Sequence, residues 1–359
     1  MAKSHPDISV VIPVYNVASS LRACLDSVVG QTVPGIEVVA VDDGSTDGSA
    51  ALLHEYQRRY PDRVKVITTG NRGANHARNT ALKQLTGEYV VFVDSDDFIE
   101  PDMCGKLLAR AVHGRNDIVF CGAYNLYDNP RTGSQIREAT GTRLVNQDFR
   151  LTDAKYEFVH LSPFPWAKLF RRSVLAGLEF PELTSFQGND GQYADLVFVL
   201  QACCRATRIG VVDEPLYNYH RTTVRGFSRR TLDVVRAFDL LTEYMRRNGH
   251  LDTFREELEY VCAMHFAHRY PRLFKRRGNL ALKLEFISAT HGFLDREFPG
   301  WRRNSYLRRS PRTVRSLLGL YSSATRMTRM VHAREHVPDF AAGLVARRLD
   351  QVNVFADLY

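Results

Sequence analysis

Glu88-Tyr89-Val90-Val91-Phe92-Val93-Asp94-Ser95-Asp96-Asp97 is an apolar run that stops at three carboxylates. The run predicts a buried parallel strand, because strands covered on both faces are continuously apolar and rich in β-branched residues. Residues two apart in a strand point the same way, so Asp94 and Asp96 can present both carboxylates to one cation. An isolated Asp-x-Asp more often caps a helix, here the one expected near Pro101. The choice between a cation site and a helix cap therefore depends on the strands predicted around this one.

Composition sets the broad class of the protein. The 359 residues suffice for one large α/β domain with an appendage or for two domains, and 44% apolar with 25% charged residues is ordinary for a folded soluble chain. The six cysteines contain no C-x-x-C pair, so neither a zinc site nor a disulfide framework is indicated. Without a long apolar window or an apolar leader segment, we expect a cytoplasmic protein.

The net charge of +8 belongs to the C-terminal tail. Residues 301–350 hold eleven arginines against three acidic residues, so the first 300 residues are nearly neutral. Apolar residues such as Leu317 and Met330 alternate with these arginines, a pattern typical of helices that lie on an anionic membrane. A solvated arginine face on a helical capping or homo-oligomerisation domain is the equal alternative. We expect no nucleic-acid partner, since no motif that reads nucleic acid is present.

Strands and helices alternate along the N-terminal part of the chain. Strands are expected over 8–16, 36–41, 64–68, 88–93 and 117–124, and helices from 19, over 49–59 and over 73–85, with Gly87 as the last helix's C-cap. This order predicts a doubly wound, mostly parallel α/β sheet whose strand ends converge on one crevice. Residues 128–145 are expected to form a loop or hairpin over the site, and 232–245, 253–270 and 280–294 to be helical. The predicted domains are 1–228 and 229–359.

Two familiar nucleotide sites are absent from the sequence. No G-x-G-x-x-G follows the first strand and no G-x-x-x-x-G-K-[ST] occurs anywhere, which argues against a nicotinamide cofactor and a P-loop. A phosphate-containing ligand at these strand ends would need another partner. Paired aspartates that hold a divalent cation would provide one.

An ordered set of motifs in the first 105 residues resembles glycosyltransferase family 2, which has the GT-A fold. The motifs are Val10-Val11-Ile12-Pro13-Val14-Tyr15-Asn16, Cys24-Leu25-Asp26-Ser27-Val28, Val41-Asp42-Asp43-Gly44-Ser45-Thr46-Asp47, Ala77-Arg78-Asn79 and Phe92-Val93-Asp94-Ser95-Asp96-Asp97. The resemblance implies an inverting transferase that uses a nucleotide-diphosphate sugar and a divalent cation, Mn²⁺ or Mg²⁺.

The resemblance also implies roles for individual residues. Donor-binding positions in this half of the chain are Pro13, Tyr15, Asn16, Asp43, Arg78, Asp94 and Ser95. Tyr15 would stack on the base and Asp43 would accept its imide N–H, while Asp42 is expected to cap its turn. Arg78 would face the nucleotide or the aspartates. Asp94 would contact ribose or metal, and Asp96 would ligate the metal directly.

The next motifs extend the resemblance toward the acceptor. Pro165-Trp166-Ala167-Lys168-Leu169-Phe170-Arg171-Arg172 resembles a segment of many bacterial members, in which Trp166 either stacks on a sugar or belongs to the core. Family members carry Glu-Asp at the start of an apolar helix, and the Asp is the catalytic base. Ala194-Asp195 falls on this position, so the glutamate is missing. We expect Asp195 to be the base, with Asp190 as a second candidate and a simple N-cap as the alternative for Asp195.

A final motif, Asp213-Glu214-Pro215-Leu216-Tyr217-Asn218-Tyr219-His220-Arg221, precedes a loop that closes over the donor in the family. His220 would complete the metal shell with Asp94 and Asp96. Arg221 and Ser228 would grip the diphosphate.

The resemblance implies a transferase of hexosyl or N-acetylhexosaminyl groups. We expect a UDP-sugar donor and a glycan, polyol-phosphate or lipid-linked acceptor of cell-surface polysaccharide or teichoic-acid biosynthesis, at the inner face of the membrane. Because the glutamate is missing, the alternative is an inactive GT-A-like module that only binds sugar or nucleotide. A nucleotidyltransferase is disfavoured, because its Gly-rich first loop is absent.

Overall fold

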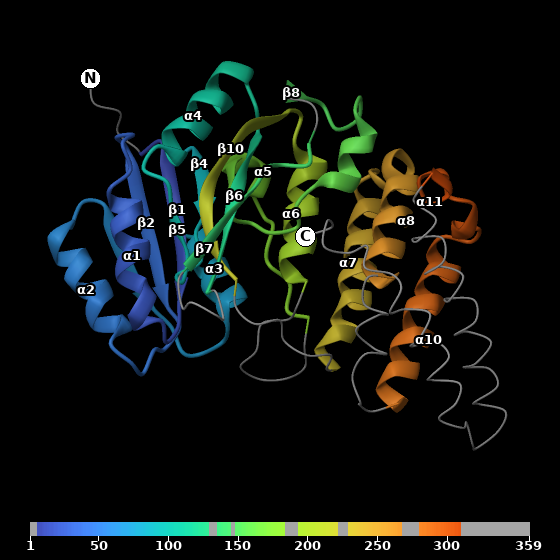
Figure 1. Ribbon diagram of the computed structural model, residues 1–359, viewed down its shortest axis with the longest axis horizontal. Coiled ribbons are helices and arrows are strands. Elements are labelled where there is room, and N and C mark those ends of the chain that lie inside the picture. The colour runs from blue at the N-terminus through green and yellow to red at the C-terminus, as the bar shows by residue number, and fades with distance from the viewer. Residues whose placement is uncertain are drawn as a thin grey trace. The chain divides into compact units, whose positions relative to one another are not determined.

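The computed structural model describes residues 6–128, 135–144, 148–183, 193–221, 229–267 and 280–309. The chain divides into two compact units, unit 1 (Met1–Val224) and unit 2 (Arg225–Tyr359) (Figure 1). Unit 1 holds a β-sheet with helices on both faces, and the described part of unit 2 is helical. The predicted α/β class and helical C-terminal region are confirmed.

The strands of unit 1 form one sheet within the described residues. They are β1 (Ile8–Val14), β2 (Ile36–Asp42), β3 (Val64–Thr68), β4 (Tyr89–Phe92), β5 (Phe98–Ile99), β6 (Ile118–Asp128), β7 (Gln135–Thr140), β8 (Asp148–Phe149), β9 (Lys168–Arg171) and β10 (Ile209–His220). The order is β3-β2-β1-β4-β9-β6-β10-β5, with β7 beside β6 and β8 beside β10. The first four strands of this order are parallel, as predicted.

Strand β4 lies in the interior of the sheet. It runs parallel to β1 and antiparallel to β9, and all its residues are buried, which explains its unbroken apolar sequence. Strand β9 was not expected, because it has only four residues and two of them are basic. Its antiparallel insertion between β4 and β6 makes the sheet mixed.

Helices cover both faces of the sheet. They are α1 (Ala18–Val29), α2 (Ser49–Arg59), α3 (Ala74–Leu82), α4 (Met103–Gly114), α5 (Arg172–Leu175) and α6 (Ala194–Arg205), with the 3₁₀ turn η1 (Lys155–His160). Alternate β1 residues Val10 and Ile12 pack in one core with α1, α2 and α4. On the other side Phe92 of β4 meets Phe198 of α6 edge to face at 5.7 Å. Side-chain alternation along each strand thus supplies two cores.

Gly87 is not a helix cap as predicted, because α3 ends at Leu82 with Lys83 as its C-cap. Gly87 is instead needed for a close contact with Ser9 of β1. Its N–H donates to Ser9 Oγ at 2.9 Å, and a Cβ at this position would lie 2.6 Å from the Ser9 backbone nitrogen. The residue must therefore be glycine to let the chain pass close to β1 as it enters β4.

The segment over 128–145 contains a hairpin. Strand β7 pairs antiparallel with the second half of β6, from Ala123↔Thr140 to Asp128↔Gln135. This strand pair selects the hairpin from the two predicted alternatives. Residues 129–134 and 145–147 lie outside the described ranges.

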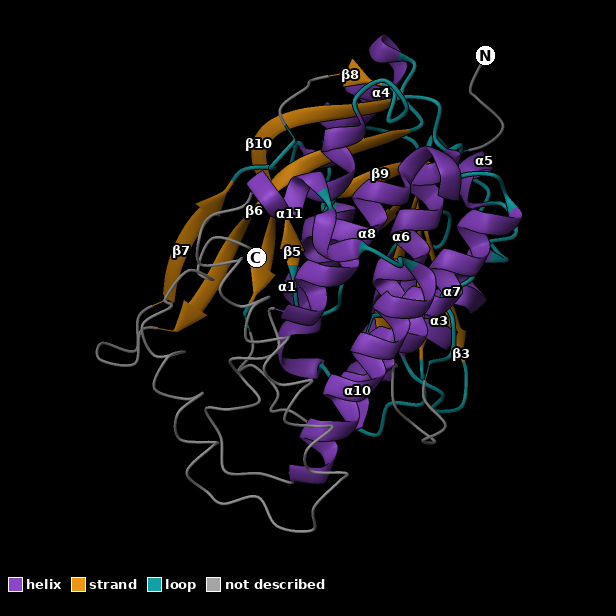
Figure 2. Cartoon of the chain, turned by 90° about the vertical axis from the view of Figure 1, so that its right-hand side faces the viewer, coloured by secondary structure: helices purple, strands orange, loops and turns teal. Residues whose placement is uncertain are grey.

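Unit 2 is built from helices that pack through aromatic side chains. They are α7 (Asp233–Arg247), α8 (Leu251–Ala267), α10 (Leu280–Glu297) and α11 (Ser305–Arg309), with the 3₁₀ turns η2 (Arg229–Leu232) and η3 (Trp301–Arg303). Helices α7, α8 and α10 lie side by side (Figure 2). Phe238, Phe266 and Phe293, one from each helix, form the shared core. The amphipathic tail predicted beyond Arg309 falls outside the described residues.

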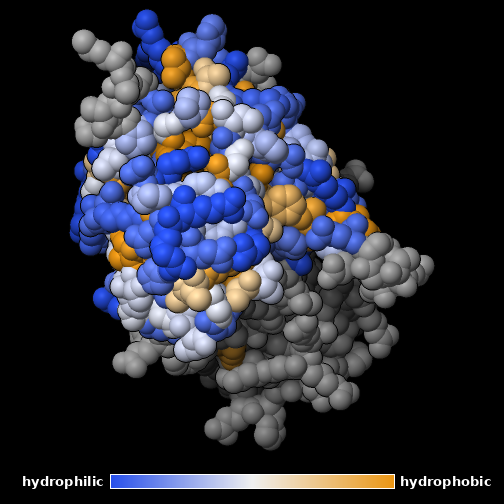
Figure 3. All heavy atoms as spheres, turned by 90° about the vertical axis from the view of Figure 1, so that its left-hand side faces the viewer, coloured by the Kyte–Doolittle hydropathy of each residue, from blue (hydrophilic) through white to orange (hydrophobic). Residues whose placement is uncertain are grey.

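Hydrophilic side chains dominate the surface on the side of α2, where hydrophobic ones form small separate groups (Figure 3). None of the described helices combines the length and apolarity needed to cross a membrane.

The six cysteines are free and buried. Burial raises the pKa of these thiols, for example of Cys104 and Cys121 to about 12.

Acid should weaken unit 2 through His291. This side chain is 4% exposed, and burial, followed by the charge of Arg302, lowers its pKa from 6.5 to about 4. The unfolded chain therefore binds more protons, and stability is lost as the pH falls from about 6.5 to about 4. At about 1.4 kcal/mol per pKa unit, the full loss is on the order of 3 kcal/mol.

The measurement is urea unfolding at pH 7.0 and 4.5, followed by Trp301 fluorescence in a Trp166→Phe background. His291→Gln should lose less stability than the parent between these pH values. An equal loss in both proteins would contradict the assignment.

Candidate active site

The loops after β1 and β2 meet at the carboxyl edge of the sheet. Pro13 lies within β1, opposite Val41 of β2. Tyr15, just past the strand, is 44% exposed, so its ring is accessible for stacking. Asn16 adopts a left-handed backbone with φ of 52° and links the two loops: its Oδ1 accepts the Thr46 N–H at 2.8 Å. The predicted donor-binding residues Pro13, Tyr15 and Asn16 thus lie together at this edge.

Asp42 and Asp43 stabilise separate turns. Asp42 Oδ1 accepts the Ser45 N–H at 3.0 Å, which confirms that Asp42 caps its turn. Asp43 is buried, and its carboxylate accepts the Thr69 hydroxyl at 2.9 Å and the backbone N–H groups of Arg72 at 3.0 Å and Gly73 at 2.5 Å. Asp43 therefore orders the loop that leads into α3, in addition to the nucleoside contact predicted for it.

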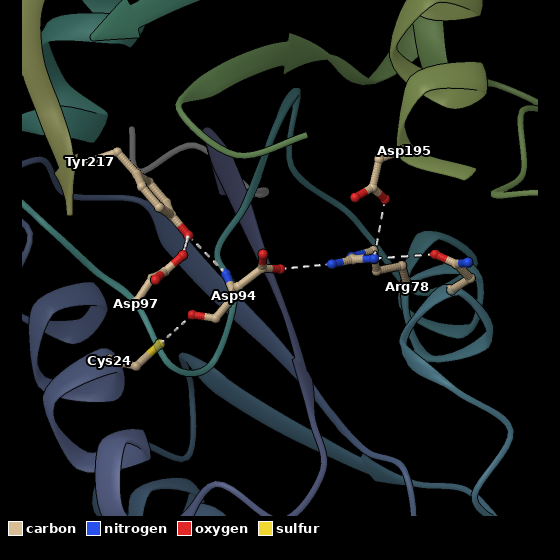
Figure 4. Close-up of polar contacts among 7 residues, drawn as sticks. Cys24, Arg78, Asp94, Asp97, Asp195 and Tyr217 are labelled. Carbon is tan, nitrogen blue, oxygen red and sulfur yellow. Dashed lines mark hydrogen bonds and ion pairs between the residues drawn. The ribbon is translucent and has the colours of Figure 1, made fainter. Parts of the chain in front are cut away.

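Arg78 of α3 lies between two carboxylates (Figure 4). Its Nη2 donates to Asp94 Oδ1 at 2.7 Å and its Nη1 pairs with Asp195 Oδ1 at 3.4 Å. Nη1 also donates to Asn75 Oδ1 at 3.2 Å, and the Arg78 side chain is only 8% exposed. Of the two predicted orientations, the structure shows the one toward the aspartates. A buried guanidinium with two carboxylate partners holds α3, the end of β4 and α6 together.

Asp195 is the second residue of α6, and the N-cap is Tyr193, with φ of 82°. The interpretation of Asp195 as an N-cap is therefore wrong. The amino end of a helix favours a carboxylate in its first turn. The Asp195 side chain is 32% exposed, so a substrate can reach it. Asp190, the second candidate, lies outside the described residues.

The three acidic residues after β4 differ in their surroundings. Burial, followed by the charge of Asp94, raises the pKa of Asp96. Asp97 is 1% exposed and accepts the Tyr217 hydroxyl at 2.7 Å and the His220 backbone N–H at 2.7 Å. Burial and then Asp94 raise the pKa of Asp97 to about 8. Ser95, which lies between Asp94 and Asp96 in the sequence, is also buried.

Asp97 and Tyr217 are not among the site residues predicted from the sequence. The available signals were the third acid of the β4 loop, Asp97, and the first of the two tyrosines that precede His220, Tyr217. Neither signal shows from sequence alone that the two side chains meet, because they are 120 residues apart.

The predicted metal ligands have the right chemistry but do not form a ready-made cluster. Within the described ranges, no three His, Cys, Asp or Glu side chains are grouped so that they could hold a metal ion. His220 Nδ1 is buried without a hydrogen-bond partner, and its Nε2 lies 3.1 Å from Gln135 Nε2 of β7. The charge of Asp94 raises the pKa of Asp96, and a divalent cation would relieve this repulsion between two carboxylates.

Trp166 stacks on protein rings. Its indole lies nearly parallel to Phe164, Tyr217 and Tyr219, with ring centroids 5.0, 5.0 and 5.1 Å away. Lys168 is 1% exposed and donates to the carbonyl oxygens of Phe164 at 2.6 Å and Trp166 at 3.3 Å, and burial lowers its pKa to about 8. The structure thus places Trp166 in an aromatic stack beside the carboxylates.

The last two predicted donor contacts lie at and beyond the end of β10. Arg221 is exposed directly after the strand, and its backbone N–H donates to the Leu126 carbonyl oxygen at 2.8 Å. Ser228 lies outside the described residues.

Comparisons with known proteins give a family match, related sequences and a structure of similar fold. The model of "Glycosyl transferase family 2" matches residues 9–178. EpsH of Bacillus subtilis, a glycosyltransferase by name, is 30% identical over 269 residues, which cover 72% of this chain and 75% of EpsH. The poly(ribitol-phosphate) beta-glucosyltransferase of Bacillus spizizenii is 34% identical over 215 residues, 59% of this chain and 32% of the relative. The structure of S. aureus TarS 1-349 in complex with UDP-GlcNAc has a TM-score of 0.68 at 21% identity and 91% coverage of both chains.

The pairing of Arg78 with its two carboxylates should be needed for stability. Arg78→Lys keeps the charge but loses the planar fork, and we expect it to lower the free energy of unfolding by about 2 kcal/mol. Adding Asp195→Asn should cost less in the Arg78→Lys background than in the wild type, since one interaction is already lost. Urea unfolding of the four proteins gives this coupling.

Arg22→Lys is the matched control. Arg22 makes an equally two-pronged pair with Glu55, with both bonds at 3.1 Å, but on the exposed surface. We expect almost no change there, because solvent screens exposed pairs. Equal effects at Arg22 and Arg78 would show that burial of Arg78 is unimportant.

Proposed function

Because the chain belongs to glycosyltransferase family 2, we propose that it transfers a sugar from a UDP-sugar to an acceptor hydroxyl, with inversion at the anomeric carbon. Its fold is the GT-A fold expected from the motifs. The observation that carries the proposal is the convergence of Asp94, Arg78 and Asp195 at the carboxyl end of the sheet. The same edge carries the exposed ring of Tyr15. Donor-binding and proton-accepting groups therefore come from separate elements to one site.

Asp195 is the proposed general base. Its carboxylate would accept the proton of the acceptor hydroxyl as that oxygen bonds to the anomeric carbon. The bond from this carbon to the diphosphate oxygen breaks on the opposite face, so the configuration inverts. Arg78 Nη1, 3.4 Å from Asp195 Oδ1, would hold the carboxylate in place for this step. The partial exposure of Asp195 supports this role.

Asp94, Asp96 and His220 are the proposed ligands of a divalent cation, Mn²⁺ or Mg²⁺. Bound there, the cation supplies positive charge that offsets the charge developing on the diphosphate leaving group. Tyr15 and Asp43 are the proposed nucleoside contacts, with Pro13, Asn16 and Ser95 beside them. Arg221 and Ser228 are proposed to bind the diphosphate.

The acceptor and the donor sugar are proposed from the relatives. The name of the B. spizizenii relative specifies a poly(ribitol-phosphate) acceptor and glucosyl transfer, and the TarS structure contains UDP-GlcNAc. We propose an acceptor hydroxyl on a glycan, a polyol-phosphate or a lipid-linked saccharide, and a hexosyl or N-acetylhexosaminyl group as the cargo. Unit 2 is proposed to contribute to acceptor binding, self-association or contact with an anionic membrane.

The nucleotide and the cation are tested by thermal unfolding with UDP, GDP, CDP or dTDP, each with Mn²⁺ or EDTA. A ligand at about 100 times its dissociation constant adds about 2.7 kcal/mol, which raises the midpoint by several degrees. We expect the rise with UDP and Mn²⁺, and its loss with EDTA or in Asp96→Asn. A rise with another nucleotide would correct the donor, and no rise with any nucleotide would refute the proposed donor site.

The base is tested with Asp195→Asn and the matched variant Asp252→Asn. Both aspartates are the second residue of their helix, α6 and α8, so both changes remove the same favourable charge at a helix start. Asp195→Asn should lower transfer from UDP-sugars to polyol-phosphate and glycan acceptors by about 10²–10⁴-fold and leave the UDP-dependent thermal shift intact. Asp252→Asn should transfer normally.

Transfer at the wild-type rate by Asp195→Asn would remove Asp195 from the mechanism. If the wild type binds the nucleotide sugar but transfers it to none of these acceptors, a binding module without catalysis would be favoured instead.

A further inference from the structure

We propose that Asp97 and Tyr217 are positioning residues that hold the two halves of the cation site at a fixed separation. One half is the loop after β4, which carries Asp94 and Asp96. The other half is the end of β10, which carries His220. The inference rests on the proposed function, because it concerns the cation-binding site of that reaction.

The sheet alone does not connect these two halves directly. Strands β9 and β6 lie between β4 and β10 in the sheet order, so no ladder of hydrogen bonds joins β4 to β10. The chain after Asp97 crosses to β10 as β5, whose two residues pair with Tyr217 and Asn218. A pairing of two residues is a weak constraint on where a loop lies. Side chains must therefore fix the distance.

A continuous set of hydrogen bonds spans the gap, and Figure 4 shows its part from Asp94 through Tyr217 to Asp97. The Asp94 backbone N–H donates to the Tyr217 hydroxyl oxygen at 3.1 Å, and this hydroxyl donates to Asp97 Oδ2 at 2.7 Å. Asp97 Oδ1 accepts the backbone N–H of His220 at 2.7 Å. One tyrosine and one carboxylate thereby bind the backbone of a proposed metal ligand on each side.

Burial makes this arrangement rigid. Tyr217 is 0% exposed and Asp97 1% exposed, so water is not available to replace a lost bond. Trp166 stacks on the Tyr217 ring at an interplanar angle of 16°, which restricts the ring itself. Because both side chains are buried, neither Asp97 nor Tyr217 can act as a surface group. Both are therefore assigned to position Asp94 and His220 rather than to touch the substrate.

The test is Mn²⁺ affinity in the presence of saturating UDP, measured by the loss of the electron paramagnetic resonance signal of free Mn²⁺. Groups that orient metal ligands typically change metal affinity by about 10–100-fold when removed. We expect Tyr217→Phe to weaken Mn²⁺ binding by about tenfold. UDP affinity in EDTA, measured by calorimetry, should stay at the wild-type value.

Tyr56→Phe is the matched control. Tyr56 is also buried and donates its hydroxyl to an aspartate, Asp26 Oδ1 at 2.5 Å, but it joins α2 to α1. This change also removes a buried tyrosine–aspartate bond and should leave Mn²⁺ affinity unchanged. Asp97→Asn gives a second test, since it preserves the shape of the side chain but replaces one of the two accepting oxygens by an NH2 group that donates.

The outcomes separate the inference from the function on which it rests. Weaker Mn²⁺ binding in Tyr217→Phe and Asp97→Asn, but not in Tyr56→Phe, supports the positioning role. Wild-type Mn²⁺ affinity in either folded variant overturns it and leaves the proposed function standing, as does equal weakening in Tyr56→Phe. Failure of the wild-type protein to bind Mn²⁺ with UDP would overturn the cation site and the inference together.

Discussion

The burial of β4 is the constraint on which the site depends. A strand that is covered on both faces and paired on both edges can bring charged groups to the sheet only where it ends. Three aspartates follow that end, and their repulsion has to be balanced locally. Arg78 balances Asp94, and Tyr217 and the His220 backbone satisfy Asp97. The positions of α3 and β10 are thus tied to the charge at the end of one strand.

Local features of the fold could be predicted from the sequence. The periodicity of apolar residues predicts α2 over 49–59 and β3 over 64–68 with the observed bounds, and it predicts the three long helices of unit 2. It fails at β9, where pairing to two neighbours outweighs a short, basic sequence. At Gly87 the prediction is wrong because glycine serves close approach to Ser9 rather than a helix end.

The residues of the candidate site likewise divide into those that the sequence could predict and those that it could not. The β4 loop carries enough local pattern to identify Asp94 and Asp96 as candidates, whereas Asp195 is identified by the family resemblance. The contacts that Arg78 makes with Asp94 and Asp195 bring together three separate elements and depend on the folded structure. The partnership of Asp97 with Tyr217 depends on two chain segments that meet only after folding. The two alternatives for Trp166, stacking on a sugar or belonging to the core, likewise depend on Tyr217 and Tyr219 from β10.

Because all six thiols are buried, their reaction with a thiol reagent reports how often the folded chain opens. The thiolate is the reactive form of cysteine. In the folded protein burial blocks access to the sulfur, and the raised pKa lowers the fraction of thiolate. A thiol reagent therefore modifies a cysteine only during an excursion that exposes it. Five cysteines belong to unit 1 and one, Cys262, to unit 2. The number and identity of the labelled cysteines would thus distinguish opening of the sheet from opening of the helices.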